Sequence, residues 1–218
     1  MKEAPRVQTL REEFANAATH GAGLVASIAA IPILISAAVG AHDAWQVAGR
    51  AVFGATLVLL YLMSTLYHTV RSDRAKRILR TLDHSAIFLL IAGTYTPFTL
   101  GPLRGPWGWS LLVAIWTLAV FGICAKFTLG FRFPRLSTAL YITMGWLVIV
   151  AIQPLATQLS SAGLAWLIAG GLSYTVGVVF FVLDNRLRYS HALWHVFVVG
   201  GSVCHFLAVL RHAVAPVA

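Results

Sequence analysis

Three polar clusters stand out in a chain that is otherwise strongly apolar. Ser64 and His68 form one cluster, and His191 and His195 form another; the members of each pair are four residues apart. Residues at i and i+4 share one face of a helix, so two histidines spaced in this way can bind one divalent metal ion. Together with His68, they would give the three-imidazole donor set of a catalytic zinc site, whose fourth position stays open.

The remaining cluster, Leu82-Asp83-His84, adds a carboxylate. If the clusters meet, Asp83 is placed to accept a hydrogen bond from water at the metal or to act as a general base. Ser64 lies one turn deeper than His68, where it would orient Asp83 or a bound carbonyl group. We therefore predict three metal ligands, His68, His191 and His195, and two catalytic residues, Asp83 and Ser64.

The composition indicates which elements must position these residues. Of 218 residues, 59% are hydrophobic and only 11% are charged, which is far from the make-up of a soluble domain. A bilayer core about 30 Å thick needs roughly 20 apolar residues per helix. We predict an all-α membrane protein, a bundle of seven transmembrane helices. The expected spans are residues 18–39, 47–68, 82–100, 107–125, 136–153, 163–183 and 190–210.

The distribution of basic residues predicts the orientation. Of the 16 lysines and arginines, only Arg50, Arg104 and Arg211 fall on the side opposite the N-terminus. The positive-inside rule then predicts a cytoplasmic N-terminus and a C-terminus outside, which places the three polar clusters at one inner depth. The net charge of +9 is thereby explained by topology and by contact with anionic lipid headgroups, and no nucleic-acid partner is needed.

The first residues are expected to stay on the cytoplasmic side. Residues 1–17 carry most of the early charges, and Thr9 with Glu12 forms a capping-box pattern that predicts a short helix in the membrane interface. Residues 18–212 contain no long polar insertion. We predict that they form a single seven-helix domain.

Other histidines have more ordinary interpretations. His20 lies near the inner end of the first span, where a capping role and a functional role are equally favoured. His84 points about 100° away from Asp83 around its helix, which favours a structural role. His205 lies about 21 Å deeper than His191 by helical rise, so it cannot bind the same ion and is expected to make a polar bond between helices or to line a cavity.

These motifs resemble those of the hemolysin III family, which groups with the progestin and adipoQ receptors and, more distantly, with the alkaline ceramidases. The resemblance covers nearly the whole chain. It rests on the three clusters and on four further stretches: Glu12–Asn16, Thr19–Gly21, Ala92–Phe98 and Trp194–Phe197.

The resemblance implies a seven-helix fold with the N-terminus inside and a Zn2+ ion held by His68, His191 and His195. It also implies that Asp83 is associated with the water at the zinc and that Ser64 matches the family's serine. The short N-terminus is similar to that of the bacterial branch, so we expect a multi-pass protein of the bacterial inner (plasma) membrane.

Two functions from different classes follow. The first is a zinc-dependent hydrolase of a lipid amide or ester, ceramidase-like, which holds a fatty chain among the helices and contributes to membrane lipid homeostasis. The alternative is a non-catalytic homeostasis sensor in which zinc is structural and links helices. A transporter or a pore is less favoured, because few polar residues extend deeper than the clusters. The sequence does not fix the oligomeric state.

Overall fold

Helices make up almost all of the chain that this computed structural model describes, which is residue 6 and residues 8–40 and 43–213. The elements are α1 (Leu10–Val39), α2 (Ala44–Thr69), α3 (Asp73–Leu100), α4 (Pro106–Leu129), α5 (Pro134–Trp146), the 3-10 helix η1 (Leu147–Ala151), α6 (Ile152–Gln158), α7 (Ser161–Val182) and α8 (Ser190–His212).

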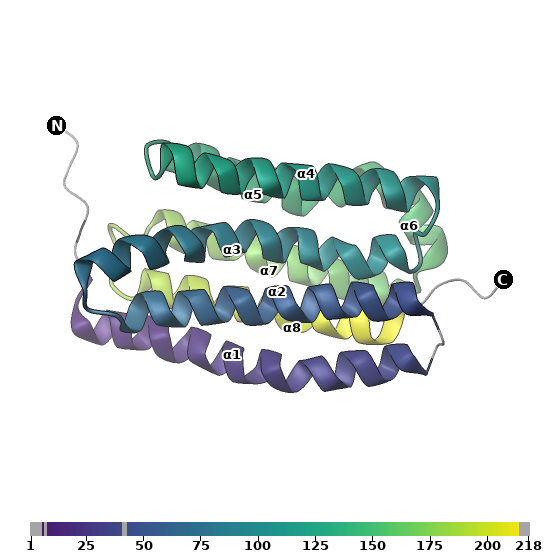
Figure 1. Ribbon diagram of the computed structural model, residues 1–218, viewed down its shortest axis with the longest axis horizontal. Helices are drawn as coiled ribbons and strands as arrows, with labels where there is room; N and C mark the ends of the chain where they lie inside the picture. Colours follow the sequence, from purple (N-terminus) through teal and green to yellow (C-terminus); the bar gives the residue numbers. More distant parts are fainter. Residues whose placement is uncertain (1–5, 7, 41–42, 214–218) are drawn as a thin grey trace.

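The helices run side by side along the long axis of the molecule (Figure 1). Helix α1 packs against α2 and α8, α2 packs against α3, α3 against α4, and α7 against α8. The start of α1, the end of α2 and the starts of α3 and α8 all lie at the left-hand end in Figure 1. The three polar clusters of the sequence are therefore at the same end of the bundle.

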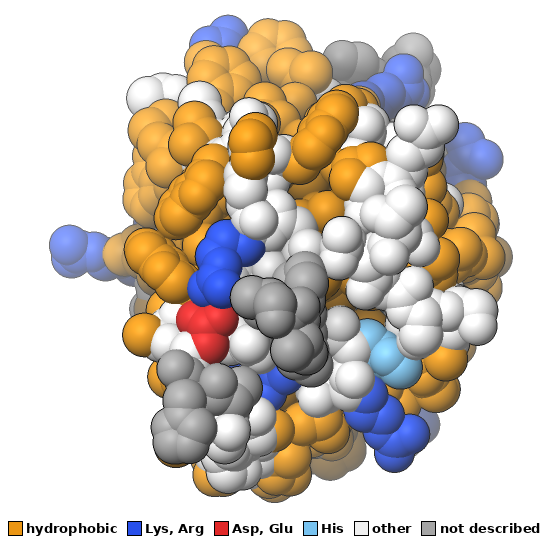
Figure 2. Space-filling model, turned by 90° about the vertical axis from the view of Figure 1, so that its right-hand side faces the viewer, with side chains coloured by type: hydrophobic (Ala, Val, Ile, Leu, Met, Phe, Trp, Pro, Cys, Tyr) orange, Lys and Arg blue, Asp and Glu red, His pale blue; other side chains and the backbone are white. Residues whose placement is uncertain are grey.

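Within the part of the chain that the structure describes, six helical stretches are long and apolar enough to cross a membrane: α1, α2, α4, the α5–α6 stretch, α7 and α8. Many of their large apolar side chains point outward, as Val25, Val113 and Val176 do. Hydrophobic side chains also surround the end of the bundle seen in Figure 2, where polar groups occupy the middle. This distribution is typical of an integral membrane protein that crosses the bilayer several times.

Helix α3 is long but is not among these six stretches. It begins with charged residues such as Asp73 and Arg74, well before the predicted span of residues 82–100, and it includes the polar segment Gly93–Thr99. The second half of α3 is largely buried between other helices. A helix that faces protein on most sides does not need an apolar surface, which explains why α3 is less hydrophobic than its neighbours.

The capping box at Thr9 is confirmed. The amide of Glu12 donates to Thr9 Oγ1 at 3.4 Å, and the amide of Thr9 donates to Glu12 Oε2 at 2.9 Å. The helix that starts there continues to Val39 without a break. We expected residues 9–16 to start a short helix in the membrane interface; in the structure, Thr9 caps α1 and the residues after it are the first turns of that long helix.

The predicted fifth span, residues 136–153, contains a change of helix type. Helix α5 ends at Trp146 and passes through η1 into α6, which continues to Gln158. The hydroxyl of Tyr95 lies at this change: it donates to the carbonyl oxygen of Met144 at 2.8 Å and accepts from the amide of Val148 at 2.9 Å. Tyr95 thus satisfies backbone groups that a change from α to 3-10 geometry leaves without partners.

Close packing between α2 and α3 generates a stability prediction. A Cβ atom added to Gly49 would lie 2.8 Å from Pro97 Cα, a backbone atom that cannot rotate away. We expect Gly49→Ala to lower the free energy of unfolding by about 1–3 kcal/mol, the usual cost of overpacking. Thermal unfolding of the purified protein in detergent measures the effect. In the matched control Gly145→Ala, the added Cβ meets nothing within 4 Å, and an equal loss in both variants would contradict the prediction.

Candidate metal centre

The structure brings the three predicted histidines together. His68 lies in the last turn of α2, and His191 and His195 lie in the first two turns of α8. One ring nitrogen from each lies within 4.8 Å of the others, and all three residues are buried. Such a group can hold a metal ion, because three imidazole nitrogens at this separation can share one coordination sphere.

The start of α8 is fixed by a residue of α1. Tyr189, in the left-handed conformation with φ 59°, precedes α8, and its amide donates to Glu12 Oε1 at 3.0 Å. Glu12 also accepts from the guanidinium of Arg6 at 2.7 Å, a contact that raises the pKa of Arg6 above its ordinary value. This buried carboxylate therefore sets the position of the α8 turn that carries His191.

Each of the three histidines uses its Nδ1 atom for a contact within the protein. Nδ1 of His68 lies 2.6 Å from Glu13 Oε2, and Nδ1 of His191 lies 3.2 Å from Asp184 Oδ2. Nδ1 of His195 lies 3.1 Å from the carbonyl oxygen of Asn16. Because these partners are acceptors, each Nδ1 carries the proton and each Nε2 keeps its lone pair for a ligand.

One of these Nε2 atoms lacks any hydrogen-bond partner. Nε2 of His68 is buried, and in the part of the chain that the structure describes nothing bonds to it. A buried polar atom without a partner costs free energy, which a bound metal would offset. The donor set, the fixed tautomers and this orphaned atom all fit a divalent metal ion with nitrogen ligands.

The contacts that hold the histidines were not predicted. Glu13 and Asn16 are one turn apart on α1, and Asp184 belongs to the turn between α7 and α8. The sequence contained a signal for Glu13, because a carboxylate near the start of an apolar helix must have a partner. Nothing local pointed to Asp184 or to the carbonyl oxygen of Asn16.

Asp83 and Ser64 lie beside the histidines. Asp83 is buried and lines the same cavity as His191 and His195. Ser64 is fully buried. Its Oγ atom lies 2.7 Å from Nδ1 of His20.

The other histidines occupy separate environments. His20 stacks on His195, with ring centroids 3.4 Å apart, so it supports the cluster from behind and does not cap α1. His84 contacts Asp83 Oδ2 at 3.6 Å and bonds to the carbonyl oxygen of Arg80. His205 bonds across to the carbonyl oxygen of Leu167 on α7 at 3.3 Å, the bond between helices that we predicted.

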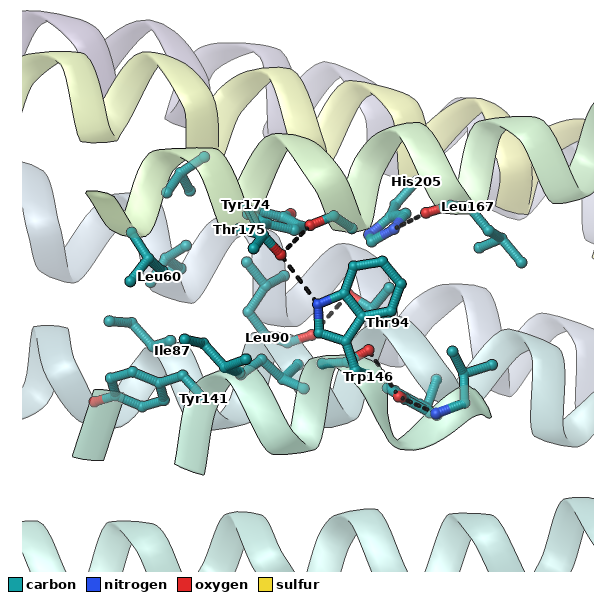
Figure 3. Close-up of a pocket in the computed structure, with 18 of the residues that line it drawn as sticks. Leu60, Ile87, Leu90, Thr94, Tyr141, Trp146, Leu167, Tyr174, Thr175 and His205 are labelled. Atoms are coloured by element: carbon teal, nitrogen blue, oxygen red, sulfur yellow. Dashed lines mark hydrogen bonds between the residues drawn. The ribbon is translucent and has the colours of Figure 1, made fainter. Parts of the chain in front are cut away.

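A cavity of about 200 Å³ extends from the histidines into the bundle. Asp83, His191 and His195 line one end, and leucines such as Leu111 and Leu155 line the part near the opposite end. Figure 3 shows its middle, where Trp146 of α5 reaches across to Thr175 of α7. Most of the wall is apolar, which suits a hydrocarbon chain.

Comparison with known proteins finds similar sequences over nearly the whole chain. The family model described as "Haemolysin-III related" matches residues 8–206. The chain is 48% identical to "Hemolysin-3 homolog" of Bacillus subtilis (strain 168) over 206 residues, which cover 94% of this chain and 96% of the relative. It is 50% identical to "Hemolysin-3" of Bacillus cereus over 203 residues, which cover 93% and 92% of the two chains. It is 29% identical to the human "Monocyte to macrophage differentiation factor" over 215 residues, which cover 94% and 85%.

The contact between Glu13 and His68 generates a prediction about metal affinity. Glu13→Gln keeps the shape of the side chain but removes the charge that holds the tautomer of His68, so we expect divalent metal affinity to fall by about 10- to 100-fold. Competition titration of the purified protein with a metal indicator measures it. Asp73→Asn, an exposed acid at the start of α3, is the control. Equal affinity in the two variants would show that Glu13 does not support the site.

Proposed function

This chain belongs to the haemolysin-III-related family, and we propose that it is a zinc-dependent hydrolase that cleaves an amide or ester bond of a membrane lipid. One observation carries the proposal. His68, His191 and His195 have their Nδ1 atoms bonded within the protein, and two of them, His191 and His195, line the end of an apolar cavity together with a buried carboxylate, Asp83.

His68, His191 and His195 would hold the zinc ion through Nε2. Zinc in such a site acts as a Lewis acid that polarises a carbonyl group and lowers the pKa of water toward about 7. Nitrogen ligands suit zinc, although they also suit other transition metals. Zinc is favoured because three histidines with an open position are the donor set of zinc hydrolases.

Asp83 would carry the proton. Its carboxylate would take a proton from the attacking water and return it to the nitrogen or oxygen of the leaving group as the C–N or C–O bond to the acyl carbon breaks. The products are a fatty acid and an amine or alcohol. Ser64 would position Asp83, since its hydroxyl is held by His20, which lines the same cavity as Asp83.

The cavity would bind the acyl chain of the lipid. Its apolar wall extends away from Asp83, so a carbonyl group placed beside Asp83 leaves the hydrocarbon chain among α3, α5, α7 and α8. Selectivity among chains would come from how closely the acyl chain fits the wall of the cavity, because a chain that leaves the bilayer is already in apolar surroundings. A ceramide or a related lipid amide has the chemistry that this geometry suits.

The proposed topology has seven spans: the six apolar stretches and, in addition, α3. The end that holds the histidines also holds most of the basic residues, including Lys76, Arg80 and Lys126. The positive-inside rule then makes this end cytoplasmic, so that α1 begins inside and α8 ends outside. In this orientation the chain would lie in the plasma membrane of a bacterium and act on lipids from the inner leaflet.

A non-catalytic sensor with structural zinc is the second candidate. The observation that favours it is that the site joins three helices: α2 and α8 supply the ring nitrogens, and α1 supplies Glu13 and Asn16. Metal binding would then fix the relative positions of these helices, and a bound lipid would change them. A pore is less favoured, because the wall of the cavity is mostly apolar along its length.

The hydrolase hypothesis predicts different outcomes for two variants. His191→Ala should lose zinc, because two imidazoles remain, whereas Asp83→Ala should keep a full equivalent of zinc. Both should lose turnover of ceramides or phospholipids, by about 10²- to 10⁴-fold for Asp83→Ala, the usual contribution of a general base. Elemental analysis and mass spectrometry of released fatty acids measure the two quantities. Undiminished turnover in Asp83→Ala would exclude its proposed role.

Metal removal separates the two candidates when stability and product are measured together. We expect chelation to lower the melting temperature of the purified protein in either case, because zinc would link α2 to α8. In a hydrolase, chelation also abolishes release of fatty acid, and added zinc restores it. If stability responds to zinc but no lipid class gives a product, the sensor is the correct function.

A further inference from the structure

Two basic side chains share one aromatic ring near the candidate metal centre. The guanidinium carbon of Arg80, on α3, lies 3.9 Å from the centroid of the Phe131 ring. The ammonium group of Lys126, on α4, lies 4.6 Å from the same centroid. Like charges so close to each other repel, so this arrangement needs an explanation.

The turn after α4 builds this cluster. Gly130 has φ 59°, a conformation that favours glycine, and it ends α4 so that the chain reverses direction. Phe131 follows directly and lies against α3, where its ring meets the ring of His84 edge-on at 4.9 Å. Three separate segments therefore hold the two cations beside Phe131.

The acidic side chains nearby are engaged elsewhere. Glu12 pairs with Arg6, Glu13 with His68 and Lys76, and Asp184 with His191, while Asp83 contacts His84. Over residues 8–40 and 43–213, no ion pair joins Arg80 or Lys126 to an acid. Lys126 is only 3% exposed, and burying a cation without an anionic partner is costly.

The chemistry of the pair suits phosphate. A guanidinium stacked on a ring keeps the N–H donors at its edge free, and their fork matches two phosphate oxygens. An ammonium group beside it adds a point charge and three rotatable donors. Both oxygens of a planar carboxylate fit one guanidinium fork, whereas the unesterified oxygens of a tetrahedral phosphate leave lone pairs directed toward a second cation.

We propose that Arg80, Lys126 and Phe131 form a binding site for the phosphate of an anionic membrane lipid. The site adjoins the cavity, because His84 touches Phe131 and also lines the cavity end that holds Asp83. A lipid whose phosphate is bound here has its acyl chain at the entrance of the cavity. The site depends on neither zinc nor hydrolysis, so it stands whether the protein is an enzyme or a sensor.

Lipid titration of the full chain in maltoside detergent tests the site. The probes are dilauroyl phosphatidylglycerol, dilauroylglycerol, which has the same chains without phosphate, and inorganic phosphate. We expect phosphatidylglycerol to bind about tenfold more tightly than either of the others, because it alone combines the phosphate with the chains. Equal binding of dilauroylglycerol would overturn the proposal. Equal binding of inorganic phosphate would assign the site to the free ion and would overturn the proposal that its ligand is a lipid.

Variants locate the binding. Arg80→Gln should weaken phosphatidylglycerol binding by about tenfold, the effect of losing a charge-assisted contact, and Lys126→Met should do the same. Arg80 is exposed, so its replacement leaves the core unchanged and decides the outcome even if Lys126→Met fails to fold. Arg77→Gln, an exposed arginine one turn earlier, is the matched control. Equal affinity in the Arg80 and Arg77 variants would overturn the proposal. Zinc content should stay unchanged in all three.

Discussion

The geometry of the metal centre depends on the hydrogen bonds of one buried group, the carboxylate of Glu12. It is 1% exposed, and it accepts hydrogen bonds from Thr9, Arg6 and the amide of Tyr189. These contacts join the first turn of α1 to the first turn of α8, although the two are far apart in sequence. A carboxylate at this depth is stable only when its oxygens are well bonded, so the same contacts that satisfy Glu12 also fix the register of α8 against α1.

The metal centre shows which parts of a site a sequence can reveal. His68, His191 and His195 were predictable because helical spacing and the lengths of the apolar stretches fix both the face and the depth of each residue. Glu13, Asn16 and Asp184 were not, because their roles depend on how α1 and the α7–α8 turn pack against α2 and α8. The two roles considered for His20 stayed open for the same reason: its stacking on His195 is a contact between α1 and α8 that no local pattern contains.

In the fold, too, local sequence patterns predicted some features, whereas others depend on contacts between helices. Apolar stretches between charges located the long helices, because a bilayer imposes one length on all of them. They could not reveal the change to 3-10 geometry at Leu147, which depends on the hydroxyl of Tyr95 from another helix. Nor could they show that α1 absorbs the segment after Thr9, since a capping box marks the start of a helix but not its length.

The division of the centre among helices has a consequence for biosynthesis. Its ring nitrogens come from α2 and α8, and their supporting acceptors come from α1 and the α7–α8 turn, so the site draws on both ends of the chain. During synthesis α1 and α2 enter the membrane long before α8 exists. Before α8 is made, the nascent chain contains only one of the three ligands, His68, and one ligand is too few to retain a metal ion. Metal retention would thus begin only when the last helix has docked against the first, and a truncated or misassembled chain would be left without it.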